Sequence, residues 1–273
     1  MTATTTLPAT TPGAPRRKPV VVALGGNALR GRGPSADAGV LRRNVASAVE
    51  SIADLAADHD VVVAHSNRLQ GMIGYLLEQG LADTLPGREI ATVRMHGVVD
   101  AGELRTIRVL MAAGVLVVCA GPPAVVGAPR MPPCTEAVVD TDVAAALLAT
   151  CLGAEALLML TDVRAVQRAW GTPAATPMRS ATPDDLRGVP LAAGSMAPKV
   201  RAACRFVEAT GGIAAIGAVH DARALLNGRC GTIVHAVNEP ARTDAVEARS
   251  RLALVPAAVA RSIGAPTAGG RSA

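Results

Sequence analysis

The stretch TDVAAALLATCLGAEALLMLTDV, residues 141–163, decides the fold class of this chain. Its first part, TDVAAALLATCLGA (141–154), is rich in Ala and Leu and favours a helix. Its second part, EALLMLTDV (155–163), is a short apolar run closed by polar residues, which indicates a strand buried on both faces. A helix followed directly by a buried strand is the repeating unit of a parallel α/β sheet.

The same alternation continues on both sides of this stretch. We predict further helices over 37–57, 69–83, 102–114 and 198–210, and a short helix over 221–228. Residues 171–190 are loop-rich, with a short helical start at 182–186. The fold expected from this order is a three-layer αβα sandwich around a mainly parallel sheet. The predicted strands are VVVAL (20–24), DVVVAH (60–65), EIATVRM (89–95), VLVVCAG (115–121), GIAAIGA (212–218) and GTIVHA (231–236).

Composition limits the classes of function. Among 273 residues there is one Phe, one Trp and one Tyr, so a row of aromatic platforms for single-stranded nucleic acid is excluded. The net charge of +5 comes from scattered arginines, and a basic balance alone does not define a partner. No apolar run approaches the roughly 20 residues of a membrane span. We therefore predict a cytoplasmic protein that binds neither nucleic acid nor membrane.

The two ends of the chain differ from its middle. Residues 1–17 consist mainly of Thr, Pro, Ala and Arg without periodicity, which predicts a disordered lead-in. Residues 18–237 read as one domain without an obvious linker. The last segment, 238–273, is rich in Ala and Arg, and we expect a partly disordered C-terminal extension there.

Lys199 is one of two lysines in the chain, and the other is Lys18 near the N-terminus. It follows a Gly/Ser/Met turn in LAAGSMAPKV (191–200), at the predicted start of a helix. An exposed lysine is the plain alternative, yet arginine is the basic residue at almost every other position of this sequence. A compact ammonium is not equivalent to a guanidinium when it must fit between phosphates. We interpret Lys199 as a phosphate-directed residue.

Other polar residues follow the predicted strands, where α/β sheets bind their ligands. Gly25 and Gly26 allow an anion to approach the backbone closely, although a tight turn also uses glycine. His65 is either an active-site group or a satisfied strand-end histidine. Asp142 and Asp162 could each hold Mg²⁺, orient Lys199 or contact a ribose. The plain alternatives are a helix N-cap for Asp142 and a turn residue for Asp162.

Several segments, taken in order, resemble the amino-acid kinase superfamily and within it the carbamate kinases. The resemblance covers about residues 19–236, with gaps. Because the later segments are long and collinear, the resemblance is specific. The segments are VVVALGGNALRGRG (20–33), VVDTDVAAALLATCLGAEALLMLTDVRAVQRAWGTP (138–173), ATPDDLRG (181–188) and LAAGSMAPKVRAACRFVEATGG (191–212).

This resemblance implies a homodimeric kinase that transfers the γ-phosphoryl group of ATP, with Mg²⁺, to a small-molecule acceptor. It divides the domain into an acceptor half, 18–130, and a nucleotide-binding half, 131–237. Lys199 would bridge the transferred group and Asp142 would organise the positive charges around it. The resemblance assigns the nucleotide to Gly25, Gly26, Thr161, Asp162, Ser195 and Met196, and the acceptor to Asn27, His65 and Asn67.

The acceptor half departs from the pattern of carbamate kinases. HSNRLQ (65–70) stands where the family has a His-Gly-Asn-Gly-Pro-Gln loop, and AGPPAVVG (120–127) replaces a loop of four glycines. A protruding subdomain of the family is missing after ATVRMHGVVD (91–100). Two functions follow: a kinase of the carbamate kinase type, or a catalytically impaired nucleotide-binding and regulatory paralogue.

Overall fold

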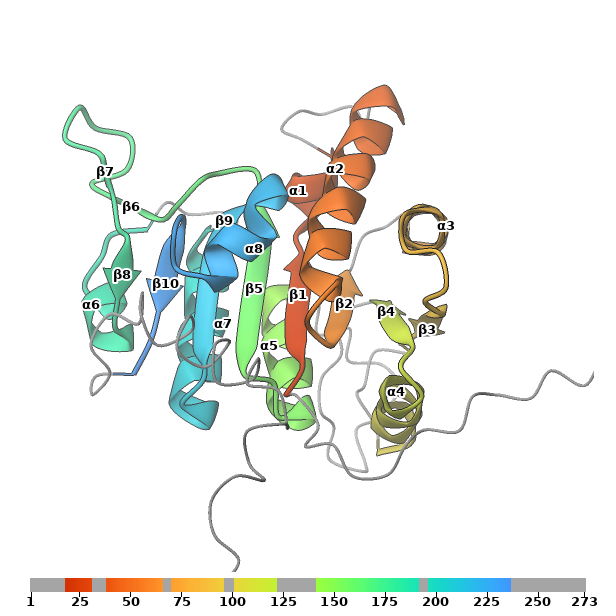
Figure 1. Cartoon of the computed structure of the whole chain (residues 1–273). Helices are drawn as coiled ribbons and strands as arrows, with labels where there is room; N and C mark the ends of the chain where they lie inside the picture. Colours follow the sequence, from red (N-terminus) through yellow and green to blue (C-terminus); the bar gives the residue numbers. More distant parts are fainter. Residues whose placement is uncertain are drawn as a thin grey trace, which may run out of the picture. The chain divides into compact units, whose positions relative to one another are not determined.

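The computed structural model describes residues 18–30, 38–65, 70–95, 101–121, 141–191 and 196–236. Its centre is an eight-stranded sheet in the order β3-β4-β2-β1-β5-β9-β10-β8 (Figure 1). Neighbouring strands run parallel except β9 and β10, which are antiparallel. The strands are β1 Val20–Leu24, β2 Val61–His65, β3 Ile90–Arg94, β4 Leu116–Ala120, β5 Ala156–Thr161, β8 Ser180–Ala181, β9 Ile213–Ala218 and β10 Thr232–Val234.

Helices cover both faces of this sheet, as Figure 1 shows. One face carries α1 (Gly26–Arg30), α2 (Ala38–Ala56), α3 (Gln70–Thr84), η1 (Val219–Asp221) and α8 (Ala222–Leu226), whose apolar residues form one core cluster with the sheet. The opposite face carries α4 (Ala101–Ala112), α5 (Thr141–Leu152), α6 (Pro183–Arg187) and α7 (Met196–Thr210). The predicted three-layer αβα sandwich is therefore confirmed.

The apolar runs of the sequence explain why the central strands are buried. In β1, Val21 and Ala23 belong to the core beneath α5 and α7, while Val20 and Val22 belong to the core beneath α2. Successive side chains of a strand point to opposite faces, so a strand covered on both sides must be apolar throughout. β1, β2, β4 and β5 are buried over their whole length, whereas the edge strand β3 is partly exposed.

The structure adds elements that periodicity did not reveal. The chain after β1 begins the short helix α1 at Gly26. The region 171–190, expected as loop-rich, contains β8 and most of a small hairpin made of β6 (Gln167–Arg168) and β7 (Thr176–Pro177). Strands of two residues are too short to show an apolar period. The expected helical start at 182–186 is α6. Thr182 and Asp185 cap its N-terminus with reciprocal hydrogen bonds between side chain and backbone.

Some predictions concern residues outside the described part of the chain. The lead-in 1–17 and the whole extension 238–273 lie there, and the division at 130/131 stays a prediction. Among the described residues, none of the helices combines the length and apolarity that crossing a bilayer requires.

We predict that Gly231→Ala destabilises the fold far more than Gly211→Ala. Both glycines have positive φ, +72° and +65°, so alanine costs about 1 kcal/mol of backbone strain at either position. A Cβ at Gly231 would also clash with the Leu225 side chain and lie 2.7 Å from the Ile216 carbonyl oxygen, while Gly211 faces open space. Overpacking of this kind adds roughly 1–3 kcal/mol. Equal free energies of unfolding for the two variants, measured in urea, would contradict this packing.

Candidate active site

Lys199 and Asp142 form a buried ion pair between two neighbouring helices. The Lys199 Nζ donates to the Asp142 carboxylate at 2.9 Å (Oδ2) and 3.1 Å (Oδ1). The two side chains are 5% and 6% exposed. α5 supplies Asp142, α7 supplies Lys199, and these helices pack side by side. Lys199 is therefore not the exposed lysine of the plain alternative.

Gly25 leaves the space that the Lys199 ammonium occupies. A Cβ on Gly25 would lie 2.9 Å from Nζ and 3.2 Å from Cε of Lys199. Gly25 follows β1 directly, and its N–H donates to the Leu160 carbonyl of β5 at 3.2 Å. Because β1 and β5 are parallel neighbours with Leu24 opposite Leu160, the ammonium lies at their carboxyl ends. This is the edge at which open α/β sheets bind ligands.

The helix positions of the two charged groups reinforce their pairing. Asp142 is in the first turn of α5, where the partial positive charge of the helix end stabilises a carboxylate. It lies inside the helix rather than at its cap, so the capping interpretation does not describe it. Lys199 is in the first turn of α7, where the same partial charge disfavours a cation. Asp142 offsets that disadvantage and fixes the direction of the ammonium.

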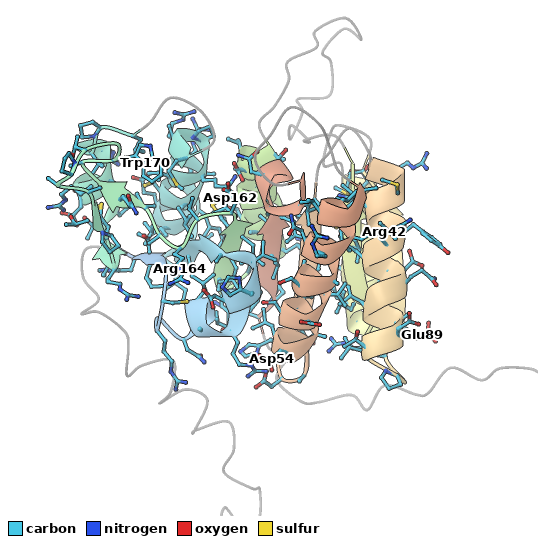
Figure 2. All side chains as sticks on the ribbon, turned by 90° about the horizontal axis from the view of Figure 1, so that it is seen from above. Arg42, Asp54, Glu89, Asp162, Arg164 and Trp170 are labelled. Carbon is cyan, nitrogen blue, oxygen red and sulfur yellow. The ribbon has the colours of Figure 1, made fainter. Side chains whose placement is uncertain are left out.

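Thr161 is the last residue of β5, and Asp162 follows it at the carboxyl end of that strand. Thr161 is buried, and its Oγ1 donates to the Asp162 carboxylate at 3.2 Å. Asp162 itself is exposed, and Figure 2 shows it above the middle of the sheet. Gly26 and Asn27 are half-buried at the start of α1, and Met196 is half-buried at the start of α7. Ser195 and Asn67 lie outside the described residues.

His65 ends β2 and is only 3% exposed. Neither ring nitrogen has a hydrogen-bond partner in the part of the chain that the structure describes. Burial lowers the pKa of His65 from 6.5 to about 4, so the ring is neutral at physiological pH. A Cβ on Gly74 of α3 would lie 3.4 Å from Nε2, so Gly74 makes room for the ring. A neutral imidazole can donate one hydrogen bond and accept another, but it brings no positive charge.

The site therefore offers a fixed positive charge, the Lys199 ammonium, at the carboxyl ends of β1 and β5. The ammonium lies next to the backbone of Gly25. Sequence reasoning selected Lys199, Asp142 and Gly25 separately, and the structure brings these three together. It missed Gly74, whose contact with His65 follows from the packing of α3 on the sheet. The sequence did contain a signal for Gly74. A glycine in the middle of a predicted helix is unfavourable for the helix, which indicates a packing reason for its presence.

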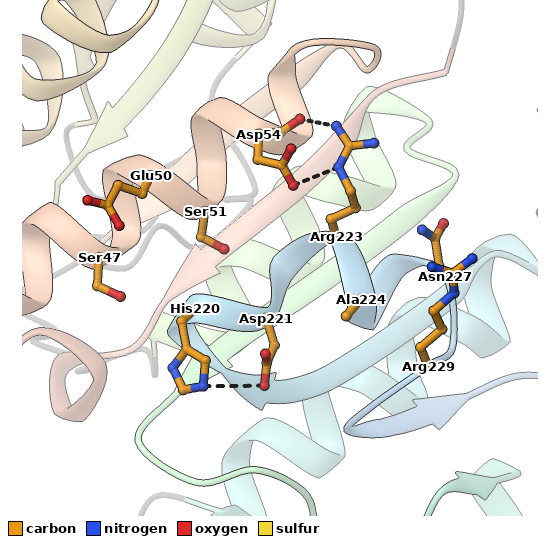
Figure 3. Close-up of a pocket in the computed structure, with 10 residues that line it drawn as sticks. All are labelled: Ser47, Glu50, Ser51, Asp54, His220, Asp221, Arg223, Ala224, Asn227 and Arg229. Atoms are coloured by element: carbon orange, nitrogen blue, oxygen red, sulfur yellow. Dashed lines mark hydrogen bonds and ion pairs between the residues drawn. The ribbon is translucent and has the colours of Figure 1, made fainter.

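A separate cavity of about 400 Å³ lies between α2 and the segment of η1 and α8 (Figure 3). Its wall includes Asp54, His220, Asp221 and Arg223. Arg223 is paired with Asp54 and Asp58, and His220 lies 3.6 Å from Asp221. The cavity is on the face of the sheet opposite α5 and α7, so it is distinct from the Lys199 site.

We predict that His65 makes stability fall in mild acid. Its pKa is about 4 in the folded protein, below the ordinary histidine value of 6.5, so the unfolded chain binds the proton more tightly. The free energy of unfolding then decreases as the pH drops from about 6.5 toward 4, by at most ~1.4 kcal/mol per pH unit. Urea unfolding at several pH values should show a shallower slope in this window for His65→Gln. Identical slopes would contradict a buried, neutral His65.

Comparison with known proteins agrees with this geometry. Residues 70–216 match the model of the amino acid kinase family. The chain is 33% identical to carbamate kinase from Rhizobium meliloti (strain 1021), over 79% of this chain and 92% of the relative. It is 31% identical to carbamate kinase from Escherichia coli (strain K12), over 80% and 99%. Carbamate kinase from Giardia lamblia bound to AMP-PNP superposes with a TM-score of 0.70 at 26% identity, over 80% of this chain and 98% of that one.

These similarities span most of the described sheet and include both helices of the buried ion pair. They show a phosphotransferase related to the carbamate kinases. The chain belongs to the amino acid kinase family.

Proposed function

We propose that the protein transfers the γ-phosphoryl group between ATP, bound with Mg²⁺, and carbamate or another small acid. The observation that carries this proposal is the Lys199 ammonium, which Asp142 holds against Gly25 at the carboxyl ends of β1 and β5. Kinship with carbamate kinases supports the choice of reaction. A catalytically impaired paralogue would retain the ion pair of Lys199 and Asp142 but would not turn over substrate. An assay of the reaction therefore distinguishes the kinase from the impaired paralogue.

Phosphoryl transfer needs the kind of group that Lys199 provides. Negative charge spreads over the oxygens of the moving phosphoryl group, and the protein contributes mainly position and positive charge. A charge fixed in advance stabilises that state without reorganisation during the reaction. Lys199 meets this requirement because Asp142 accepts hydrogen bonds from the ammonium and holds it in place.

The nucleotide would lie along the carboxyl ends of β1 and β5. We assign its binding to Gly25, Gly26, Thr161, Asp162, Met196 and Ser195, the last of which is outside the described residues. The related Giardia structure contains AMP-PNP, which supports ATP as the donor. Among the described residues, no three metal-ligating side chains gather. Mg²⁺ usually binds through substrate phosphates and one or two carboxylates, so Asp162, exposed at the end of β5, fits better than Asp142, which binds Lys199.

The acceptor would bind on the other side of Lys199, toward β2. We assign it to Asn27, His65 and Asn67, of which Asn67 is outside the described residues. Only residues 66–69 separate β2 from α3, and only 95–100 separate β3 from α4. The alignment with the Rhizobium meliloti enzyme runs over 299 positions although it includes 79% of a 273-residue chain. That relative therefore has internal segments without a counterpart here.

We further propose a cytoplasmic homodimer. Met72 and Tyr75 on α3 and Val109 on α4 are large apolar side chains that are 48–62% exposed. They flank the half of the sheet that ends in β3, which has a single neighbouring strand in the part of the chain that the structure describes. An edge strand of this kind presents backbone groups that can pair with another chain. The described cysteines are all free, which fits a reducing compartment.

The direct test measures ADP formation from ATP, Mg²⁺ and carbamate, and ATP formation from ADP and carbamoyl phosphate. We expect turnover in at least one direction, and a panel of small carboxylic and phosphoric acids would reveal a different acceptor. ATP binding without turnover on any acceptor would favour the impaired paralogue. Absence of ATP binding at millimolar concentration would contradict both functions.

We predict that Lys199→Arg and Gly25→Ala each lower kcat by at least about 100-fold, the usual cost of one lost charge-stabilising group. Arginine keeps the charge, but a guanidinium is larger than the space beside Gly25. Alanine at position 25 places a methyl group 2.9 Å from Nζ and displaces the ammonium without changing any charge. Gly188→Ala is the matched glycine control, because φ there is −84° and a Cβ would meet only the Asp185 carbonyl oxygen at 4.0 Å. Steady-state kinetics decide, and wild-type kcat in Gly25→Ala would argue against the role of Lys199.

A further inference from the structure

A serine and a histidine lie in hydrogen-bonding contact at the end of the sheet farthest from β3. Oγ of Ser180, in β8, is 2.8 Å from Nε2 of His235, the residue that follows β10. Ser180 is exposed and His235 is half-buried. A hydroxyl and an imidazole at this distance have the geometry of a nucleophile beside its general base.

The pairing of β8 with β10 brings these two side chains to the same face of the sheet. Ala181 and Val234 are opposite each other in the parallel register, and both belong to the core beneath α5 and α7. Side chains alternate between the faces along a strand, so Ser180 and His235, each one position away, point to the other face. The N–H of His235 donates to the Ala181 carbonyl at 3.2 Å and fixes the register. The sheet itself therefore holds the hydroxyl beside the imidazole.

A backbone carbonyl determines which nitrogen of His235 carries the proton. Nδ1 lies 2.9 Å from the Ala236 carbonyl oxygen, which can only accept a hydrogen bond, so Nδ1 holds a hydrogen. In the neutral ring, Nε2 then keeps its lone pair. The Ser180 hydroxyl therefore donates to Nε2, which is the orientation in which an imidazole can take the serine proton. The Ala236 carbonyl thus acts as the third group that orients the base.

Charged side chains lie near this pair. Asp185 of α6 accepts hydrogen bonds from the N–H and the hydroxyl of Thr182, both at 2.8 Å, and these bonds hold the pKa of Asp185 below its ordinary value. The nearby charges of Arg168 and His235 lower this pKa further. A carboxylate close to a general base supports the positive charge that the base acquires in the reaction. The Arg168 guanidinium offers a positive charge to an anionic leaving group such as phosphate.

The pair of Ser180 and His235 is remote from the Lys199 site. β8 is four strands from β1 in the order β1-β5-β9-β10-β8, which corresponds to about 19 Å at ~4.8 Å per strand. β10 is antiparallel to β9, and β8 is parallel to β10, so the carboxyl ends of β8 and β10 also lie at the opposite edge from those of β1 and β5. Figure 1 shows β8 and β10 at one end of the sheet, away from β3 and β4. A reaction at Ser180 therefore does not use Lys199.

We propose that Ser180, activated by His235, is a nucleophile that accepts an acyl group from an acyl phosphate. Oγ attacks the carbonyl carbon, and its proton passes to Nε2. The bond between that carbon and the phosphate oxygen breaks, and the imidazolium returns the proton to the departing phosphate. The products are an ester of Ser180 and free phosphate. The choice of donor rests on the proposed function, because carbamoyl phosphate, the product of phosphoryl transfer to carbamate, is itself an acyl phosphate.

The test treats the full chain with two probes, acetyl phosphate and p-nitrophenyl acetate, and locates the acetyl group by peptide mass spectrometry. We expect both probes to acetylate Ser180, and Ser180→Ala to abolish labelling of this peptide. His235→Gln should lower the rate about 100-fold, the usual contribution of a general base. His220→Gln is the matched control, because His220 is an exposed histidine of η1 and its loss should leave the rate unchanged. The chain has only two lysines, which limits competing acetylation of amines.

Three results would overturn the inference. Wild-type protein that carries no acetyl group on Ser180 after either treatment would show that this hydroxyl is not a nucleophile. Equal labelling rates in the wild type and in His235→Gln would show that the histidine does not act as the base. Labelling by p-nitrophenyl acetate but not by acetyl phosphate would contradict the class of donor. Both probes are added from outside, so these results are independent of ADP formation from carbamate, whose absence would contradict the proposed function alone.

Discussion

The site depends on one constraint. The Lys199 ammonium and the Asp142 carboxylate form a buried ion pair, and the ammonium fits only because the residue next to it, Gly25, has no side chain. Lys199 and Asp142 are almost inaccessible to water, and removing either partner would leave a buried charge at a cost of roughly 3–5 kcal/mol. A buried pair of this kind adds little stability compared with apolar residues, so its value lies in position. Gly25 completes the constraint, because any Cβ there would push the ammonium away.

The two core layers explain how the fold sets this position. α5 and α7 pack on one face of the sheet and bring Asp142 and Lys199 to the carboxyl ends of β1 and β5. On the other face, α1 and α2 pack on the same strands. Because close-packed interiors do not deform continuously, this packing holds the Lys199 ammonium at the carboxyl ends of β1 and β5. His65, buried and neutral, lies one strand further and adds hydrogen-bonding groups without a competing charge.

The layered architecture could be predicted from sequence because fully buried strands must be apolar runs, as in β1, β2, β4 and β5. The β6–β7 hairpin could not be predicted, because its strands are two residues long and its turn depends on the positive φ of Ala169. Lys199 was visible as a rare lysine, and the resemblance to a known family suggested Asp142 as its organiser. That the two meet across 57 positions, with Gly25 as the third member, required the packing of α5 on α7. The contact of Gly74 with His65 likewise depends on how α3 sits on the sheet.

The most direct measurement of the central claim is a crystal structure of the full chain with Mg²⁺ and AMP-PNP. The account predicts that the Lys199 Nζ keeps its hydrogen bond to Asp142 and donates another to an oxygen of the terminal phosphates, with those phosphates beside Gly25. A structure in which the nucleotide binds while its phosphates lie beyond hydrogen-bonding distance of Nζ would contradict it.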